Sequence, residues 1–195
     1  MAKQPKKLAV DQVEKTIKGE KVILRPWKKS DEKALQKLVN DKSIARFTSI
    51  PFPYSKKDSV WFINHSKKCF RDGTEKLYAI AVKETGEIAG GASLIRIESR
   101  HRKAEIGYWL GKGFRKKGLV KEAVKLLLEH GFGKMKLNRI AIKCHQQNKR
   151  SRKVIEKAGA KFEGIERQGA ISGLGKKADM RVYSILASEF KRKVI

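Results

Sequence analysis

A short basic stretch in the middle of the chain has the residue types that bind a phosphate group. Three glycines and three consecutive basic residues lie close together there: Gly111, Gly113, Arg115, Lys116, Lys117 and Gly118. The residues before them alternate like a strand, and apolar residues after Gly118 recur with the period of a helix. Such a strand, glycine turn and helix bring unpaired backbone N–H groups and the positive end of a helix dipole to one point. We therefore predict that this turn binds a phosphate or pyrophosphate.

Two common phosphate-binding motifs do not fit this turn. A P-loop needs Lys and then Ser or Thr directly after its second glycine, but Leu119 and Val120 follow Gly118. A dinucleotide fingerprint that starts at Gly111 needs a third glycine where the chain has Lys116. The residues themselves leave two readings open, a specific anion site or an ordinary surface turn whose lysines are only solvated.

A second group of chemical interest is a short predicted helix over Lys149–Ala158, which Asn148 can cap. Ser151 shares the inward face of this helix with the apolar residues Val154, Ile155 and Ala158. A hydroxyl on a buried face needs a hydrogen-bond partner. It either bonds back to the carbonyl one turn earlier or donates a proton or hydrogen bond into a cleft.

The periodicity of the chain predicts one mixed α/β domain that positions these two groups. About seven strands are expected: Lys21–Trp27, Leu77–Lys83, Glu87–Ile97, Glu105–Leu110, Asn138–Cys144, Lys161–Arg167 and Ala178–Leu186. Helices are expected after Ser30 as N-cap, from about Asp58, after Gly118 and over Lys149–Ala158. We place the domain at residues 20–190, between a basic N-terminal arm (residues 1–19) and a short C-terminal tail (residues 191–195).

The composition is strongly basic, with 47 Lys and Arg against 20 Asp and Glu in 195 residues, a net charge of +27. Such a charge attracts polyanions such as nucleic acid and repels free polyamines, although a lysine-rich proteome or a thermophilic surface produces the same bias. The two cysteines, Cys69 and Cys144, are too few for a disulfide framework and indicate a reducing cytoplasm. No apolar run approaches the ~20 residues of a membrane helix, and no apolar segment typical of a secretory signal follows the basic start.

His65 and Cys69 lie four residues apart in the predicted second helix, a spacing that is compatible with a metal site. No second pair of ligands lies nearby in the sequence. We therefore expect no metal.

Five motifs along the chain are typical of one enzyme superfamily. Arg115-x-x-Gly118-x-Val120 is similar to the signature that holds the pyrophosphate of acetyl-CoA, although Val120 replaces a small residue. The remaining matches are Leu24-Arg25-Pro26 with Asp31, Ala104–Leu110, the block from Asn148 through Ser151 and Glu156-Lys157-Ala158-Gly159 to Gly164, and Asp179 with Tyr183-Ser184. Together they resemble the GNAT N-acetyltransferases, in particular the branch that acetylates ribosomal-protein N-termini at alanine or serine. The resemblance covers roughly residues 20 to 190.

This resemblance implies a splayed mixed sheet flanked by helices, with acetyl-CoA as the cosubstrate. The pantetheine would lie along the backbone of Tyr108, Trp109 and Leu110, and Asn148 would contact the pantetheine arm. The pyrophosphate would lie at the basic turn, against Arg115, Lys116, Lys117, Gly118, Leu119 and Val120.

Acetyl transfer needs a base for the incoming ammonium, donors for an oxyanion and a proton for the leaving thiolate. Glu105 matches the glutamate that many GNAT enzymes use as the base, often through water. Alternatively, it is a structural carboxylate paired with Arg100 or Arg102. Ile155 stands where many GNAT enzymes have a tyrosine for the thiolate. We therefore assign that role to Ser151, whose counterpart is proposed for it in the ribosomal branch.

We expect a cytoplasmic N-acetyltransferase, monomeric or homodimeric, that acts on the N-terminal α-amine of a ribosomal or other protein and docks on rRNA through its basic surface. The alternatives are an enzyme for a small amine (an amino acid, polyamine or antibiotic) and a non-catalytic ribosome- or RNA-binding protein. The chain has no RNA-binding aromatic signature, helix-turn-helix spacing or zinc pattern. The acceptor pocket is expected between Arg46–Tyr54, the residues around Trp61 and the Gln168–Lys177 loop.

Overall fold

The computed structural model describes residues 16–190. Most of the predicted N-terminal arm and the whole predicted tail lie outside the described residues. Within the described part of the chain, no helix is long and apolar enough to cross a membrane.

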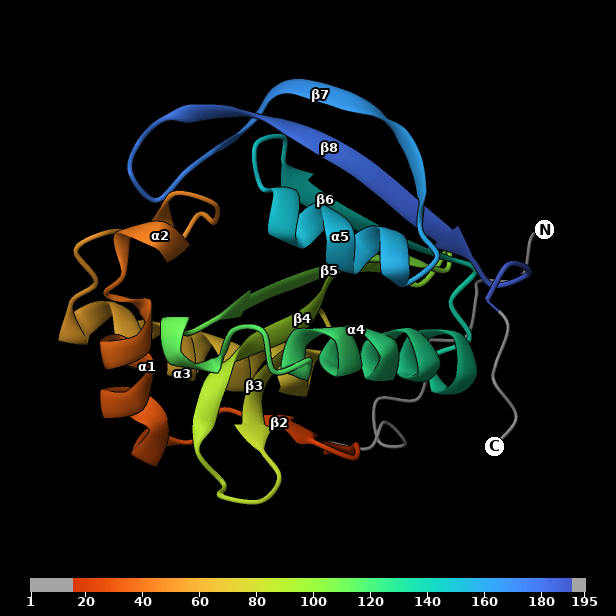
Figure 1. Cartoon of the computed structure of the whole chain (residues 1–195). Helices are drawn as coiled ribbons and strands as arrows, with labels where there is room; N and C mark the ends of the chain where they lie inside the picture. The colour runs from red at the N-terminus through yellow and green to blue at the C-terminus, as the bar shows by residue number, and fades with distance from the viewer. Residues whose placement is uncertain (1–15, 191–195) are drawn as a thin grey trace.

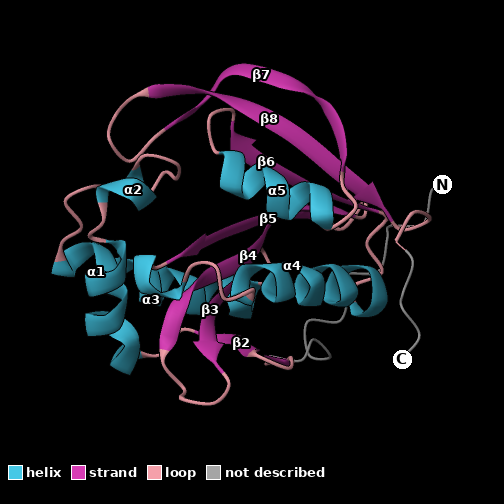
Figure 2. Ribbon diagram, viewed as in Figure 1, coloured by secondary structure: helices cyan, strands magenta, loops and turns pink. Residues whose placement is uncertain are grey.

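The described residues form one mixed sheet flanked by helices (Figures 1 and 2). The strands lie in the order β1-β2-β3-β4-β5-β6-β8-β7. Their bounds are β1 (Ile17–Lys18), β2 (Val22–Pro26), β3 (Lys76–Val82), β4 (Ile88–Glu98), β5 (Lys103–Leu110), β6 (Arg139–His145), β7 (Lys161–Ile171) and β8 (Lys177–Leu186). The helices are α1 (Glu32–Val39), α2 (Lys42–Ala45), α3 (Lys56–Asp72), α4 (Leu119–Glu129) and α5 (Lys149–Lys157). The predicted α/β class is confirmed, and β1 adds a strand that begins inside the predicted arm.

The sheet separates two layers of helices (Figure 2), since its strands alternate between two apolar cores. On β3, Tyr78 and Ile80 belong to the core that includes the buried face of α4. Ala79 and Ala81 face the other way, into a smaller core with buried residues of α1 and α3. The amphipathic helices therefore cover opposite faces of the same strands.

The sheet opens between β5 and β6, as the resemblance implies. These two strands are parallel and pair only from Lys103, opposite Arg139, to Ile106, opposite Ile142. Beyond Ile106, β5 stays with β4 as far as Leu110, while β6 continues with β8. The divergence is visible in Figure 1 and leaves the β6-facing edge of residues 107–110 without a neighbouring strand.

The predicted N-cap Ser30 is wrong. A 3₁₀ turn over Lys29–Asp31 precedes α1, and Asp31 occupies the N-cap position. The Asp31 carboxylate accepts hydrogen bonds from both terminal guanidinium nitrogens of Arg25 (2.7 and 2.8 Å) and from the Lys28 N–H. Burial opposes the charged form of Asp31, but these bonds and the charge of Arg25 outweigh it and lower its pKa. This ion pair gives a structural reason for the Leu24-Arg25-Pro26 and Asp31 motif.

The predicted loop over Gln168–Lys177 is largely a hairpin. β7 runs to Ile171 and β8 begins at Lys177, because the two strands pair again at Ala170 and Ala178 after an irregularity. The turn between them meets the segment after α2, where the Gly173 N–H donates to the carbonyls of Ala45 (2.9 Å) and Thr48 (2.7 Å). A Cβ on Gly173 would lie 1.7 Å from a backbone oxygen of Ile50, so only glycine permits this approach.

Candidate functional site

The N-terminal end of α4 has the backbone geometry of an anion site. Gly118 is the N-cap residue, with a left-handed φ of 81°, and it supplies no side-chain cap. Within the described residues, no hydrogen bond uses the N–H groups of Lys116, Lys117 or Gly118. The first turn of α4 adds further N–H groups without helical partners. The arrangement can bind an anion through main-chain donors.

The cations around this turn differ in part from those that the motif predicts. The Lys21 ammonium lies 3.9 Å from where a Cβ on Gly118 would stand, so the residue just before β2 also contributes a cation. The Arg115 guanidinium instead points to α2, where it donates to the Ser43 hydroxyl (2.8 Å) and pairs with Asp41 (3.5 Å). Burial opposes the charge on Asp41, but Ser43 and Arg115 outweigh it and lower its pKa. In this structure Arg115 holds the turn against α2 by its side chain.

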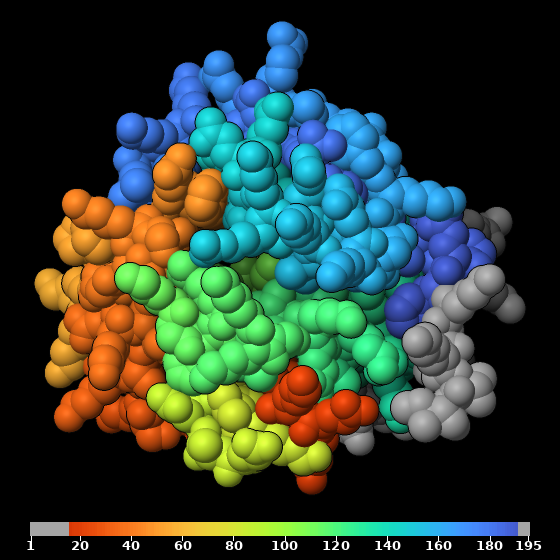
Figure 3. Space-filling model, in the orientation of Figure 1, coloured from red at the N-terminus to blue at the C-terminus, as the bar shows by residue number. Residues whose placement is uncertain are grey.

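A hollow lies beside this turn, where β5 leaves β6. In Figure 3 the surface is hollowed between the green residues before α4 and the cyan residues of α5. Its strand edge is the part of β5 that includes Tyr108, Trp109 and Leu110, whose alternate N–H and C=O groups face away from β4. The Trp109 ring is held from behind by Trp27, with which it stacks at 6.3 Å and 11°.

Two hydroxyl groups meet at this hollow. The Ser151 Oγ on α5 lies 2.8 Å from the Tyr108 hydroxyl on β5, so it does not follow the alternative of bonding back along its own helix. Asn148 caps α5, as predicted, and its Oδ1 accepts a hydrogen bond from the Ser151 N–H (3.1 Å). Burial raises the pKa of Tyr108 well above its ordinary value, although its bond to Ser151 acts in the opposite direction. Both hydroxyls therefore stay protonated and can donate hydrogen bonds.

Glu105 lies on the other face of β5, three residues before Tyr108. The strand alternates, so Glu105 shares its side with Trp109, which packs against the smaller core, while Tyr108 packs against the larger one. Its carboxylate accepts a hydrogen bond from Arg96 (2.9 Å), and Lys143 lies 4.0 Å away. Neither Arg100 nor Arg102 is its ion-pair partner among the described residues. Glu105 is 16% exposed, so an amine can still reach it.

Several of these contacts have no signal in the amino-acid sequence. Arg96 reaches Glu105 because it has a φ of 51° at an irregularity in β4, which re-aims its side chain. Lys143 belongs to a predicted strand, and its position there does not show which carboxylate it faces. Tyr108 is predicted to contact the cosubstrate through its main chain, and that prediction assigns no role to its hydroxyl. Glu105 and Tyr108 are three residues apart in a predicted strand, and an odd spacing places two side chains on opposite faces.

A cavity of about 320 Å³ opens among the segments expected to bind the acceptor. Aromatic, aliphatic and small polar residues line it together with one carboxylate: Ser49, Ile50, Pro51, Tyr54, Asp58, Trp61 and Phe62. Two of the three expected segments thus form its wall. The third, the turn after β7, is hydrogen-bonded to the segment that carries Ile50. Burial and the nearby Asp58 charge raise the pKa of Tyr54 to about 12.

The cavity is connected to the Glu105 side of β5 through packed aromatic rings. Phe62, which lines the cavity, meets the Trp27 ring edge-on at 5.6 Å. Trp27 in turn stacks on Trp109, which shares a face of β5 with Glu105. The cavity and the Glu105 carboxylate therefore lie on the same side of the sheet.

A mixed sheet that splits between two parallel strands, with free main-chain N–H groups at a helix end beside the split, is the arrangement expected of an acyl-CoA-dependent transferase. The model of the acetyltransferase (GNAT) domain family matches residues 21–161. The chain belongs to this family, and it is an acetyl-CoA-dependent N-acetyltransferase.

Curated relatives with different acceptors match the chain. It is 30% identical over 178 residues to an uncharacterized N-acetyltransferase, p20, of Bacillus licheniformis, covering 90% of this chain and 98% of that protein. It is 30% identical over 117 residues to a ribosomal-protein-serine acetyltransferase of Escherichia coli (strain K12), covering 60% and 64%. A spermidine N(1)-acetyltransferase of the same strain is 27% identical over 143 residues, covering 73% and 74%.

Solved structures agree with the fold. A RimL ribosomal alpha-N-protein acetyltransferase in complex with coenzyme A superposes with a TM-score of 0.80 at 25% identity, covering 88% of this chain and 97% of that one. The microcin C7 self-immunity acetyltransferase MccE, in complex with acetyl-CoA and AMP, gives a TM-score of 0.77 at 28% identity, covering 86% and 93%.

Proposed function

We propose that this enzyme transfers the acetyl group of acetyl-CoA to the N-terminal α-amine of a ribosomal or other protein. The observation that carries the proposal is the character of the cavity on the Glu105 side of β5. Its lining is mainly apolar, and its single carboxylate, Asp58, already caps α3 through Ser55. Such a cavity suits the first side chains of a polypeptide, whereas a polyamine needs a carboxylate for each ammonium it buries.

The cosubstrate would occupy the hollow between the turn, α5 and β5. The N–H groups at the start of α4, with Lys21, would hold the pyrophosphate, while Lys116 and Lys117 add positive charge at the surface. The free edge of Tyr108–Leu110 would pair with the amides of pantetheine. Asn148 uses Oδ1 for its cap, so its Nδ2 is the group that can contact the same arm. The acetyl thioester supplies the activated carbonyl.

Glu105 would act as the base. An acceptor amine arrives protonated and must lose a proton before it can attack a carbonyl. Glu105 lies level with Ala141 of β6, one residue before the strands part, so its carboxylate stands at the narrow end of the split. Arg96 and Lys143 fix the position of the carboxylate.

Ser151 and Tyr108 would stabilise the leaving thiolate from the other face of β5. A thiol has a pKa near 8.5 and a phenol one near 10. Because burial raises the pKa of Tyr108 further, complete proton transfer from this pair to a thiolate is uphill. The pair therefore acts mainly as a hydrogen-bond donor to the thiolate, which solvent then protonates.

The small-amine alternative has one specific support, the similarity to a spermidine acetyltransferase. The net charge of +27 opposes it, because a cationic field lowers the local concentration of free polyamines. The non-catalytic alternative has no support, since the chain belongs to an acetyltransferase family.

A substrate panel separates the two acceptors. The protein is incubated with labelled acetyl-CoA and, at equal concentrations, ribosomal proteins, short peptides that begin with Ala or Ser, spermidine and an aminoglycoside. We expect label in the proteins and peptides, and mass spectrometry should locate it at the α-amine. Faster labelling of spermidine than of every peptide would overturn the proposal in favour of the small-amine enzyme.

Docking on rRNA is the second part of the proposal, and α5 offers a surface for it. Its outward side is basic: Lys149, Arg150, Arg152, Lys153 and Lys157. Each phosphate contact changes the slope of log affinity against log salt by about 0.9 for a duplex. Acetylation of ribosome-bound substrate should therefore fall steeply with salt, and that of a short neutral peptide much less.

A matched pair of variants tests whether α5 makes this contact. Lys149→Glu with Lys153→Glu reverses two exposed charges on α5, and Lys33→Glu with Lys37→Glu makes the same change in net charge on α1. At saturating acetyl-CoA, only the α5 variant should acetylate ribosome-bound substrate more slowly and with a shallower salt dependence. Equal effects of both variants would mean that the overall charge acts, and that α5 is not the contact surface.

A further inference from the structure

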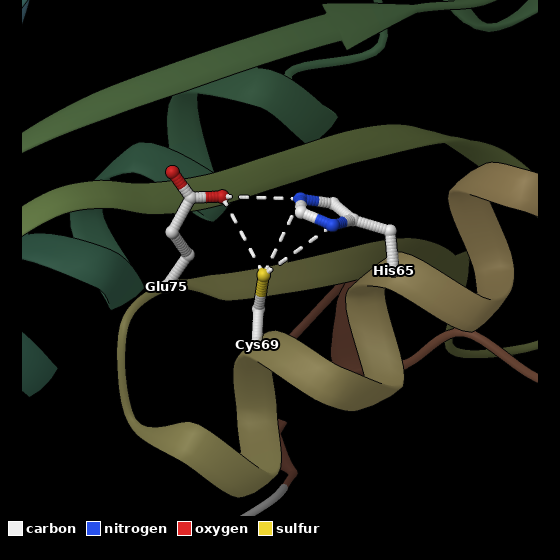
Figure 4. Close-up of side chains that lie close together, drawn as sticks. All are labelled: His65, Cys69 and Glu75. Carbon is white, nitrogen blue, oxygen red and sulfur yellow. Dashed lines mark hydrogen bonds and ion pairs between the residues drawn. The ribbon is translucent and has the colours of Figure 1, made fainter.

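We propose that His65, Cys69 and Glu75 form a binding site for one thiophilic divalent cation, with Zn²⁺ as the best fit. The three side chains converge at the C-terminal end of α3 (Figure 4). The spacing of His65 and Cys69 is visible in the sequence, but two ligands do not make a site. The structure adds a third ligand and changes that expectation.

The third ligand arrives because α3 ends in a sharp reversal. Gly73 is the C-cap residue and has a left-handed φ of 71°, which turns the chain back toward β3. Glu75 follows two residues later and places its carboxylate against the last turns of the helix. Glu75, six positions after Cys69, thus comes close to His65 and Cys69, which lie one helical turn apart.

The distances between the donor atoms match a tetrahedral site. Cys69 Sγ lies 3.3 Å from His65 Nε2 and 3.9 Å from Glu75 Oε2, and these last two atoms are 4.0 Å apart. Zinc bonds of about 2.0–2.3 Å at tetrahedral angles place neighbouring ligand atoms about 3.5 Å apart. Side-chain shifts of a few tenths of an ångström would therefore close the site around the ion.

The donor set and its surroundings favour zinc. Thiolate, imidazole and carboxylate are its usual ligands in proteins, and three of them leave one tetrahedral position for water. Cys69 is buried, whereas His65 and Glu75 keep 38% and 29% of their side chains exposed, which gives the ion a path of entry. The Trp61 ring stacks on His65 at 4.8 Å and 7°, and so holds the imidazole in its ligating orientation.

The basic surroundings weaken binding without preventing it. Lys67, Lys68 and Arg71 lie on the same stretch of α3, but all three are exposed. Exposed charges interact through water and are screened by salt, whereas a thiolate and a carboxylate touch the ion directly. Binding displaces the thiol proton of Cys69, so the affinity should fall as the pH is lowered.

The ion would cross-link the end of α3 to the segment that enters β3. The three ligands lie on α3 and just before β3, whereas Ser151 lies on α5 and Tyr108 on β5. We therefore expect the ion to raise stability and to leave the chemistry of acetyl transfer unchanged.

Metal titration of the full-length, untagged, chelator-stripped protein tests the proposal. Zn²⁺ should bind with a stoichiometry of one and raise Tm by several degrees. Co²⁺ should give a thiolate-to-metal charge-transfer band, which reports the Cys69 bond directly. Cys69→Ala should abolish the band, and Glu75→Gln, a change of similar size at a partly exposed position, should weaken Zn²⁺ binding at least ~10-fold.

Cys144→Ala is the matched control, because it removes the other cysteine and leaves the cluster intact. The control should retain one Zn²⁺ and the full cobalt band. The proposal is overturned if the wild-type protein takes up no stoichiometric Zn²⁺, or if Cys69→Ala binds it as well as the wild type. In either case Cys69 and His65 form only a hydrogen-bonded pair.

Discussion

Replacement of Gly118 at the N-cap of α4 gives the sharpest test of the anion site. Asparagine and aspartate are similar in size, and both tolerate a left-handed φ better than other residues with a side chain. The site has room for a Cβ, whose nearest neighbour would be the Lys21 ammonium at 3.9 Å. Gly118→Asp and Gly118→Asn therefore carry a similar backbone cost and differ by one negative charge.

The size of the effect follows from Coulomb's law. Two unit charges 4 Å apart interact by about 1 kcal/mol in water and about 4 kcal/mol near a protein surface. This turn is exposed, so repulsion from a pyrophosphate should lie in the lower half of that range. The aspartate would also pair with Lys21 and withdraw it from the phosphate. Gly118→Asp should therefore bind acetyl-CoA ~10- to 100-fold more weakly than Gly118→Asn.

Calorimetric titration of both variants with acetyl-CoA measures this difference, and circular dichroism checks that both are folded. Salt should narrow the difference, because it screens exposed charges. S-acetylpantetheine, which lacks the pyrophosphate, should bind both variants equally. Equal affinities for acetyl-CoA in two folded variants would refute the placement of the pyrophosphate at this turn.

Three further predictions concern catalysis and stability. Glu105→Gln should lower the acetylation rate ~10²–10⁴-fold, with a smaller defect at high pH where more amine is already neutral; a defect that does not change with pH would contradict its role as base. Ser151→Ala and Tyr108→Phe should each slow transfer ~10- to 100-fold at saturating acetyl-CoA, and the double variant should be little worse, because the two hydroxyls act as one unit; additive losses would separate them. A hydrogen bond from Arg139 lowers the pKa of Glu163 to about 2, so this carboxylate contributes stability above its ordinary pKa of 4.5 and loses it as the pH falls toward 2. Since Glu163 is 37% exposed, the contribution is about 1 kcal/mol or less, and urea unfolding of Glu163→Gln should approach that of the wild type as the pH falls from about 4.5 to about 2.

Local patterns predicted the elements around the candidate anion site well, because each depends on neighbouring residues. The strand before the turn, the glycine at the start of α4 and the Asn148 cap of α5 are all set within a few positions. Ser30 failed as a cap for the opposite reason. Its neighbour Asp31 is held by Arg25 from the preceding strand, and that bond defines the start of the helix.

The partners of the candidate site residues come from distant parts of the chain, and the sequence alone does not show which residue meets which. Arg115 meets Ser43, a residue 72 positions away, and no local pattern connects the two. Glu105 pairs with Arg96 because a left-handed residue interrupts β4, whereas Arg100 and Arg102 are nearer in sequence. The chain has many arginines and lysines, and their spacing in the sequence does not predict which of them pairs with a given carboxylate in the fold.

The register of β5 would let one strand serve both halves of the proposed reaction. Ile106 is its last residue paired with β6, so Glu105 lies at the closed end of the split and Tyr108 in the open part. The three-residue interval also places the two side chains on opposite faces. A cosubstrate in the split would therefore have the carboxylate on the side of the acceptor cavity and the hydroxyl pair on the side of α5. Deprotonation of the amine and stabilisation of the thiolate would thus occur on opposite sides of the same strand, with no competition between the two groups for one position. An inserted residue between Glu105 and Tyr108 would bring both to one face, and we expect it to abolish transfer even where acetyl-CoA still binds.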